Sequence, residues 1–132
     1  MKHFTYAVFL ALFSLTTVLS PYARACDYSV VLWDSYGDGW NGGALTVLVN
    51  GTAVITNATL ADGSGPAVYV FSVNHGDVIA TVYTAGSWSS ENYYYIYDSH
   101  GSQVFADGLF DQTPVGGFAA NGVCPENDLG VS

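Results

Sequence analysis

The residues of this chain that are best suited to chemistry lie in one short stretch, Asp34-Ser-Tyr-Gly-Asp-Gly-Trp-Asn-Gly-Gly43. Its two aspartates are four residues apart, and its four glycines let the backbone fold back on itself, because glycine adopts positive φ without a Cβ clash. Such a loop can direct carboxylate and carbonyl oxygens at one point. Calcium binds roughly six to eight such oxygens, so we predict a Ca²⁺ site here. The alternative is an ordinary turn between strands.

The loop is not an EF-hand, although the first half of its spacing agrees with one. Asp34, Tyr36 and Asp38 occupy the first, third and fifth positions of that motif, and Gly39 the sixth. Leu45 stands where an EF-hand has its bidentate glutamate. The flanking residues also have the pattern of strands. We therefore expect the missing carboxylate to come from another part of the chain.

The N-terminal residues 1–25 have the pattern of a secretory signal peptide. Lys2 provides the positive start, residues 8–19 an apolar run, and residues 23–25 an A-x-A cleavage site. The run is too short for a membrane span. We therefore expect a secreted protein, extracellular or at the cell surface, with no membrane insertion after cleavage. Lipidation of Cys26 is the alternative, which Arg24 disfavours because a small residue is expected there.

The charge of the chain excludes several classes of partner. The sequence has eleven acidic residues and only two basic ones, Lys2 and Arg24, which both lie in the expected signal peptide. A mature domain without basic side chains cannot offset phosphate charge, which excludes nucleic acids and anionic membranes. Such a domain also repels itself unless cations bind. This favours calcium independently of the loop.

The only two cysteines, Cys26 and Cys124, lie at opposite ends of the expected mature domain. An even number of cysteines in an exported chain indicates a disulfide. Closing so long a loop contributes about 4–5 kcal/mol in the chain-entropy description. We expect a single domain over residues 26–124, clasped by this disulfide, and a flexible C-terminal tail over residues 125–132.

Between the cysteines, short apolar or alternating segments are separated by turn-forming residues, and no segment has a helical period. Asn50-Gly51 is a strong hairpin signal. Residues 67–73 are apolar on both faces except Ser72, which favours a central strand. The expected strands are residues 28–33, 44–50, 52–56, 67–73, 77–84, 91–98 and 102–106. This spacing predicts an all-β fold, an antiparallel β-sandwich similar to a jelly roll.

The loop also carries a resemblance to a known kind of module. Residues 34–42 fit the pattern D-x-x-G-D-G-W-N-G, and Trp88-Ser-Ser-Glu91 and Ile96-Tyr-Asp98-Ser-His-Gly101 follow about fifty residues later. This combination resembles a module of secreted and cell-surface proteins over roughly residues 28–108. The family is a β-sandwich without established catalysis, and the resemblance implies the same for this chain.

The resemblance further implies a set of site residues. Asp34, Asp38 and Glu91 are expected to converge on one cation. Four more residues are candidates for additional metal ligands or for shaping the loops: Tyr36, Trp40, Asn41 and Asp98.

A run of tyrosines provides a second candidate surface. On a strand, Tyr93, Tyr95 and Tyr97 share one face, and Trp88 precedes them in the chain. Aromatic rings with polar tips suit sugar stacking and protein interfaces. We interpret this face as a possible glycan or partner surface. The alternative is that the rings only cover the edge of the core.

Two triplets have the N-glycosylation pattern, one at Asn50 and one at Asn57. Asn50 is also explained as a turn residue, so Asn57 is the better acceptor.

Catalysis has little support in the sequence. A carboxylate pair could in principle hydrolyse glycosides, but Asp34 and Asp38 are better explained as metal ligands. His75 and His100 lie in glycine-containing turns, the cysteines are assigned to a disulfide, and no basic residue remains to stabilise an oxyanion. Two non-catalytic functions remain. One is a self-associating structural or adhesive subunit of a surface fibre, coat or matrix; the other is a soluble lectin-like module that binds an extracellular glycan through the calcium loop and the tyrosine face. Open strand edges and charge that cations can bridge favour the first.

Overall fold

The computed structural model describes residues 24–126. The expected signal peptide, apart from Arg24 and Ala25, and the expected tail from residue 127 onward therefore lie outside the described residues. Within residues 24–126, no helix is long and apolar enough to cross a membrane.

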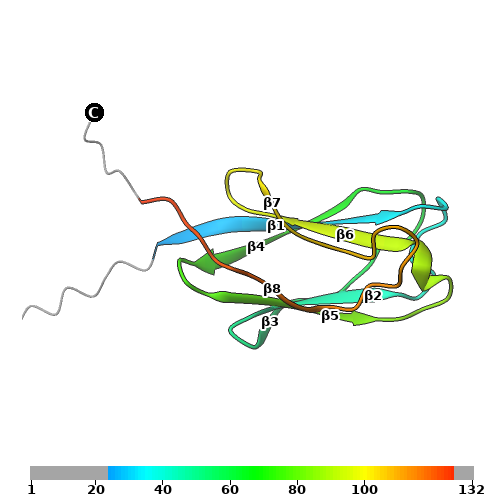
Figure 1. Cartoon of the computed structure of the whole chain (residues 1–132), viewed down its shortest axis with the longest axis horizontal. Helices are drawn as coiled ribbons and strands as arrows, with labels where there is room; N and C mark the ends of the chain where they lie inside the picture. Colours follow the sequence, from blue (N-terminus) through cyan, green and yellow to red (C-terminus); the bar gives the residue numbers. More distant parts are fainter. Residues whose placement is uncertain (1–23, 127–132) are drawn as a thin grey trace, which may run out of the picture.

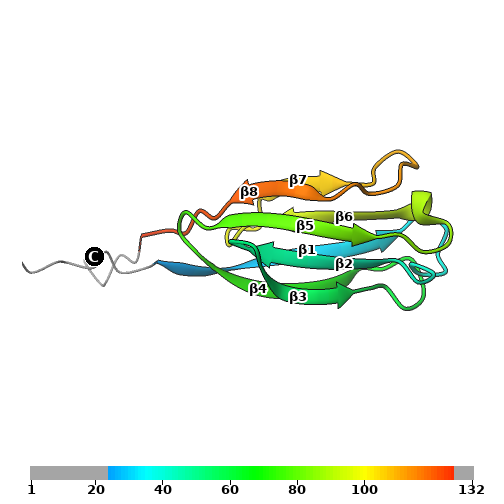
Figure 2. The same cartoon turned by 90° about the horizontal axis from the view of Figure 1, so that it is seen from below.

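The chain folds into two antiparallel four-stranded sheets that pack face to face, as Figures 1 and 2 show. The strands are β1 (Ala25–Asp34), β2 (Ala44–Val49), β3 (Thr52–Ala58), β4 (Ala67–Asn74), β5 (Val78–Thr84), β6 (Asn92–Tyr97), β7 (Gln103–Asp107) and β8 (Gly117–Asn121). One sheet has the order β4-β1-β6-β7 and the other β3-β2-β5-β8. The predicted all-β sandwich is confirmed.

Most connections of the chain cross from one sheet to the other. Only the β2–β3 and β6–β7 hairpins stay within a sheet. The pairing of β1 with β6 is the one that matters for the site, because it places Asp34 opposite Asn92. Two segments that are almost sixty residues apart in sequence thereby meet at one end of the sandwich.

Acidic residues lie at the two ends of the sandwich. The long loops, residues 35–43, 59–66, 85–91 and 108–116, gather at the end on the right of Figure 1. We call this the acidic end; its carboxylates are Asp34, Asp38, Asp62, Glu91, Asp107 and Asp111. The opposite end, which we call the disulfide end, holds Asp27, Asp77, Asp98 and Glu126. The strands between them carry no charge except near their ends.

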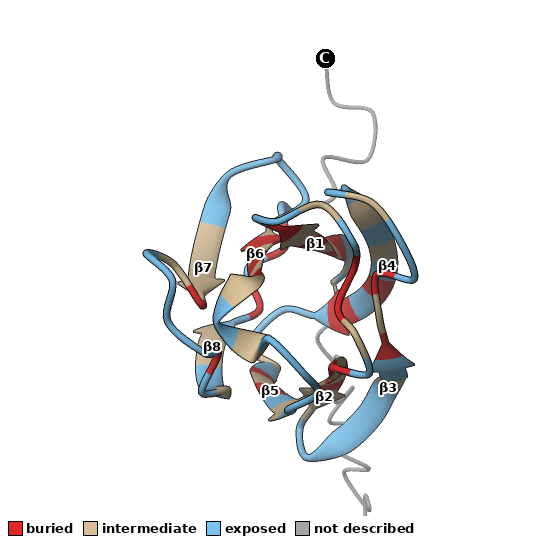
Figure 3. Cartoon of the chain, turned by 90° about the vertical axis from the view of Figure 1, so that its right-hand side faces the viewer, coloured by how far each residue is buried: buried red, intermediate tan, exposed pale blue. Residues whose placement is uncertain are grey.

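The core follows from the strand alternation. Tyr28, Val30 and Leu32 of β1 point inward, and Tyr94 and Ile96 of β6 point inward beside them. The second sheet completes the cluster with Leu45, Val47 and Ile79. Figure 3, viewed from the acidic end, shows these buried positions between the two sheets.

The predicted disulfide is confirmed. Cys26 and Cys124 are bonded across a sequence separation of 98, with Cα atoms 5.5 Å apart. Tyr28 supports the clasp, because its hydroxyl accepts a hydrogen bond from the Val123 N–H at 2.8 Å. The last described residues are thus tied to the first strand.

Two features of the fold differ from the sequence-based expectation. Residues 67–73 were expected in a central strand, but β4 is an edge strand, and its outward residues Val68 and Val70 are exposed. Apolar residues on both faces therefore do not mark a central position here. Strand β8 was not predicted, because its sequence, Gly-Phe-Ala-Ala-Asn, is short and poor in β-branched residues. A 3₁₀ turn, η1 (Ser89–Glu91), precedes β6.

Trp40 closes the core at the acidic end, and its removal should destabilise the fold. The side chain is fully buried, its Nε1–H donates to the Trp33 carbonyl at 2.8 Å, and its ring meets Tyr83 edge-on. Trp40→Ala should lower the free energy of unfolding by about 3–5 kcal/mol, measured by urea denaturation. Trp40→Phe, which keeps an aromatic ring, should lower it less. An unchanged midpoint for Trp40→Ala would contradict this role.

Candidate metal site

The candidate site is built around the carboxylate of Asp34, the last residue of β1. Its Oδ2 accepts hydrogen bonds from three successive backbone N–H groups, those of Gly37 at 2.6 Å, Asp38 at 2.8 Å and Gly39 at 3.2 Å. Aspartate often accepts from the backbone that follows it in this way. The loop is therefore curled around one oxygen of this side chain.

Gly39 shows why the loop needs glycine. Its φ is +83°, and a Cβ atom would lie 2.6 Å from the carbonyl oxygen of Leu60. The close approach is used, because the Trp40 N–H donates to the same oxygen at 2.8 Å. The loop after β1 is thereby fixed against the loop after β3.

The other oxygen of Asp34, Oδ1, is buried and has no hydrogen-bond partner among the described residues. The whole residue is only 2 % exposed. Asp107, which organises the loop after β7, is different: its two oxygens accept from the Gly108 and Gly116 N–H groups and from the Tyr94 hydroxyl. A buried carboxylate oxygen without a partner is costly, and a bound cation would remove that cost.

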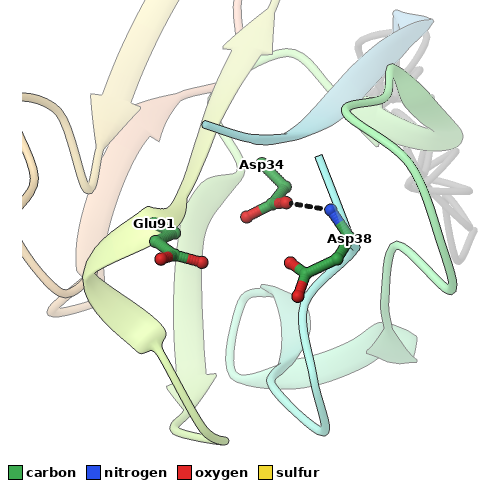
Figure 4. A group of neighbouring side chains, drawn as sticks. All are labelled: Asp34, Asp38 and Glu91. Carbon is green, nitrogen blue, oxygen red and sulfur yellow. Dashed lines mark hydrogen bonds between the residues drawn. The ribbon is translucent and has the colours of Figure 1, made fainter. Parts of the chain in front are cut away.

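Two more carboxylates lie next to this oxygen. Ligand oxygens of Asp34, Asp38 and Glu91 all lie within 4.8 Å of one another. Figure 4 shows the three side chains directed toward a common point, with one oxygen of Asp34 bonded to the Asp38 backbone and the other facing Glu91. Glu91 is held there by the Ser35 N–H, which donates to its carbonyl at 2.9 Å. The structure thus brings together the three residues expected to bind the cation.

The electrostatics of the cluster are unfavourable without a cation. Partial burial, followed by the negative charges of Asp34, Asp38 and Asp111, raises the pKa of Glu91 above its ordinary value. Like charges at this distance disfavour ionisation. The nearest basic side chain among the described residues does not help, because Arg24 lies at the disulfide end and pairs with Glu126.

The four candidates for additional ligands or loop shaping have different places. Trp40 is buried under the loop, and Asn41 donates to Asp38 Oδ1 at 3.1 Å, so both shape the loop. Tyr36 is exposed at the rim of the cluster. Asp98 lies at the disulfide end, where its Oδ1 accepts from two backbone N–H groups of the β6–β7 turn. It shapes that turn and is distant from the cluster.

One polar residue of the site escaped the sequence pattern. Asn92 is fully buried opposite Asp34; its Nδ2 donates to the Tyr83 hydroxyl at 2.8 Å, and its Oδ1 has no partner within residues 24–126. The alternation of inward and outward residues along β6 could have revealed it, because Asn92 lies on the same inward face as Tyr94 and Ile96. A buried polar side chain among core positions is an informative exception to the apolar pattern of a strand.

The tyrosine face is separate from Trp88. Tyr93, Tyr95 and Tyr97 form an outward row on β6 with neighbouring ring centroids about 6 Å apart, 5.9 and 6.1 Å. Trp33 of β1 stacks on the first of them. Trp88 instead lies beside the acidic cluster. Trp88 and the first two residues of the tyrosine row therefore line two neighbouring hollows that have Glu91 in common, and the role of these aromatic residues as a glycan or partner surface stays a prediction.

The two glycosylation candidates differ in accessibility. Asn57 is exposed at the end of β3. The amide of Asn50 is engaged in the β2–β3 turn, where Nδ2 donates to Asp77 and Oδ1 accepts from the Val78 N–H. This geometry favours Asn57, as predicted, while glycosylation itself stays a prediction.

Comparisons with protein-family models, with curated proteins and with solved structures found no match to this chain. The resemblance based on residues 34–42 therefore stays a prediction. Arguments about function rest on the carboxylate cluster and its surroundings.

The raised pKa of Glu91 predicts a pH dependence. Without a cation the folded state binds this proton more tightly than the unfolded state, so ionisation of Glu91 lowers stability as the pH rises through its raised pKa. Calcium needs the ionised form, so its affinity should fall as the pH is lowered through that same pKa. Titration calorimetry in two buffers of different ionisation enthalpy should detect proton release on binding. Glu91→Gln should release fewer protons; equal release in both proteins would contradict the assignment.

Proposed function

We propose that this chain is an exported, non-catalytic domain that binds Ca²⁺ at Asp34, Asp38 and Glu91 and acts as an extracellular structural or adhesive subunit. The observation that carries the calcium site is the divided carboxylate of Asp34. One oxygen accepts three hydrogen bonds from the loop backbone. The other is buried, has no hydrogen-bond partner among the described residues, and is turned toward two more carboxylates.

The ligand chemistry supports calcium over softer metals. The three residues offer only carboxylate oxygens, which suit hard cations, while zinc and copper sites use histidine or cysteine. The spacing also fits, because an ion with oxygen ligands at about 2.3–2.6 Å touches atoms up to roughly 5 Å apart, and these lie within 4.8 Å. No large rearrangement is needed to place the ion.

Export and the lack of catalysis have separate support. A disulfide persists in oxidising compartments, and the pattern of residues 1–25 agrees with passage to one. The carboxylates that could act as acid and base are better explained as metal ligands. The acidic end has no Lys or Arg among the described residues to stabilise a developing negative charge.

The distribution of charge supports a role in assembly. On the outer face of the β4-β1-β6-β7 sheet, the exposed or half-exposed residues are uncharged apart from Asp27 at its disulfide end; they include Val31, Trp33, Val68, Val70, Tyr93, Tyr95 and Tyr97. The outer face of the other sheet exposes Val54, Val82 and Phe118. Two copies could pack through such faces without placing carboxylates in contact. Calcium would lower the repulsion between their ends.

Calcium should stabilise the folded domain. Extracellular sites of this kind have dissociation constants on the order of 10⁻⁴–10⁻³ M, and calcium at about a hundredfold excess over that value adds roughly 2.7 kcal/mol to stability. The unfolding midpoint should rise by roughly ten degrees in calcium and return with chelator, measured by scanning calorimetry. Glu91→Gln should remove most of the increase without touching the hydrogen bonds to Asp34 Oδ2.

Asp62→Asn is the matched control for this experiment. Asp62 lies at the same end but outside the cluster, and an asparagine keeps an oxygen for the Gly63 N–H. Its calcium response should equal that of the wild type. A wild-type midpoint that is the same in calcium and in chelator would reject the metal site.

Calcium should also promote self-association. Light scattering of the purified domain should increase over a calcium titration, and less in monovalent salt of equal ionic strength. Val70→Glu places a charge on the outer face of β4 and should prevent association while leaving the calcium-dependent midpoint unchanged. A wild-type protein that stays monomeric at millimolar calcium would reject the structural-subunit role and leave the calcium site standing.

A further inference from the structure

The calcium cluster opens into a hollow of about 290 Å³ lined by Tyr36, Asp38, Trp88 and Glu91. Two of the three proposed ligands are therefore also walls of the hollow. An ion held between Asp38 and Glu91 would face it directly. The other two walls are aromatic rings, and both are exposed, Tyr36 by 76 % and Trp88 by 71 %.

The backbone presents Trp88 in an unusual way. Its φ is +56°, in the left-handed region that costs energy for a residue with a side chain. The surrounding loop is nevertheless firmly held: the Ser87 N–H donates to the Asn41 carbonyl at 3.0 Å, and the Glu91 N–H donates to the Trp88 carbonyl at 3.0 Å. The structure therefore fixes the backbone of Trp88 while leaving its large apolar ring in solvent. Trp88 precedes the η1 turn, which accounts for its backbone. Burial does not account for its exposed ring, whereas stacking on a bound ligand would.

The calcium ion would have open positions on the side of the hollow. Asp34 offers one oxygen, because three N–H groups occupy the other. Even if Asp38 and Glu91 each bound through both oxygens, the carboxylates would supply fewer than the roughly six to eight oxygens that calcium takes. The remaining ligands must come from water, from nearby protein oxygens or from a molecule in the hollow.

The negative charge around the hollow limits the class of ligand that it can bind. The three carboxylates of the cluster exceed the charge of one calcium ion, and Asp62, Asp107 and Asp111 lie at the same end. Phosphates, carboxylates and sulfates are therefore repelled. A ligand must offer neutral oxygen donors to the ion and an apolar face to the rings. A sugar ring with two adjacent hydroxyl groups offers both.

We propose that this hollow is a calcium-dependent binding site for neutral glycans, in which two adjacent sugar hydroxyls complete the calcium coordination and the sugar ring stacks on Trp88. The inference rests on the proposed calcium site. Free carboxylate lone pairs of Asp38 and Glu91 accept hydrogen bonds from the same hydroxyls. The ring that stacks on the calcium-bound sugar is Trp88 and not a member of the tyrosine row on β6.

A second hollow suggests the length of the glycan. It has a volume of about 260 Å³, shares Glu91 with the first, and is also bordered by Tyr93, Tyr95 and Phe110. Phe110 is 91 % exposed and has positive φ, as Trp88 does. A chain of sugars bound at the calcium can continue past Glu91 onto this surface. Oligosaccharides should therefore bind more tightly than monosaccharides.

The test uses the disulfide-bonded protein and a panel of neutral hexose and pentose oligosaccharides, with sulfated and uronic-acid oligosaccharides for comparison. Binding is measured by titration calorimetry in millimolar calcium and in chelator. We expect binding of at least one neutral glycan that is lost in chelator. Trp88→Ala should weaken glycan affinity by about tenfold or more, since aromatic stacking and apolar burial are both lost, and Trp88→Phe should restore part of it. Phe118→Ala, which removes an exposed ring from the other sheet, should have no effect.

Calcium affinity is measured for every variant, so the two proposals can fail separately. If calcium binds but no neutral glycan of the panel does, the glycan site is rejected and the calcium site stands. Glycan binding that persists in chelator, or that is unchanged in Trp88→Ala, also rejects the glycan site. If calcium does not bind to the wild type, both proposals fail.

Discussion

The structure of the acidic end depends on the carboxylate of Asp34, whose two oxygens have different surroundings. Asp34 Oδ2 accepts three backbone N–H groups and so dictates the path of the loop from Gly37 to Gly39. The same contacts leave Oδ1 buried, facing Glu91, and without a hydrogen-bond partner within residues 24–126. Because the loop carries Asp38 and the β1–β6 pairing fixes Glu91 beside it, folding itself gathers three negative charges. Loop geometry and the proposed cation affinity therefore both depend on one side chain, Asp34.

Much of this arrangement could be predicted from local sequence. The alternation of residues such as Tyr28, Val30 and Leu32 fixes the inward face of β1, and Asn50-Gly51 fixes a hairpin. The conformation of the loop, residues 34–43, is set locally, because aspartate accepts hydrogen bonds from the backbone that follows it and glycine allows positive φ. Glu91 was different: only the resemblance placed it beside Asp34, since no local rule states which strand pairs with β1.

The features that could not be predicted depend on long-range pairing. Strand β8 has little intrinsic preference for a strand and is formed by its pairing with β5. Asn92 is buried opposite Asp34 and donates to the Tyr83 hydroxyl, which its neighbours in sequence do not reveal. Trp88 is close to the tyrosines in sequence, but it precedes the η1 turn and lies beside the acidic cluster. Strand propensity is a property of a single segment, whereas the formation of β8 and the positions of Asn92 and Trp88 depend on how distant segments pair.

The disulfide also sets a direction for the molecule. Cys26 and Cys124 hold the first and last described strands at one end. Any polypeptide or surface attached near either of these residues is joined at the pole opposite the carboxylate cluster. Such an attachment leaves the carboxylate cluster at the far end of the domain, about the length of a β-strand away. The disulfide thus fixes which end of the domain would lie farthest from an attachment near Cys26 or Cys124.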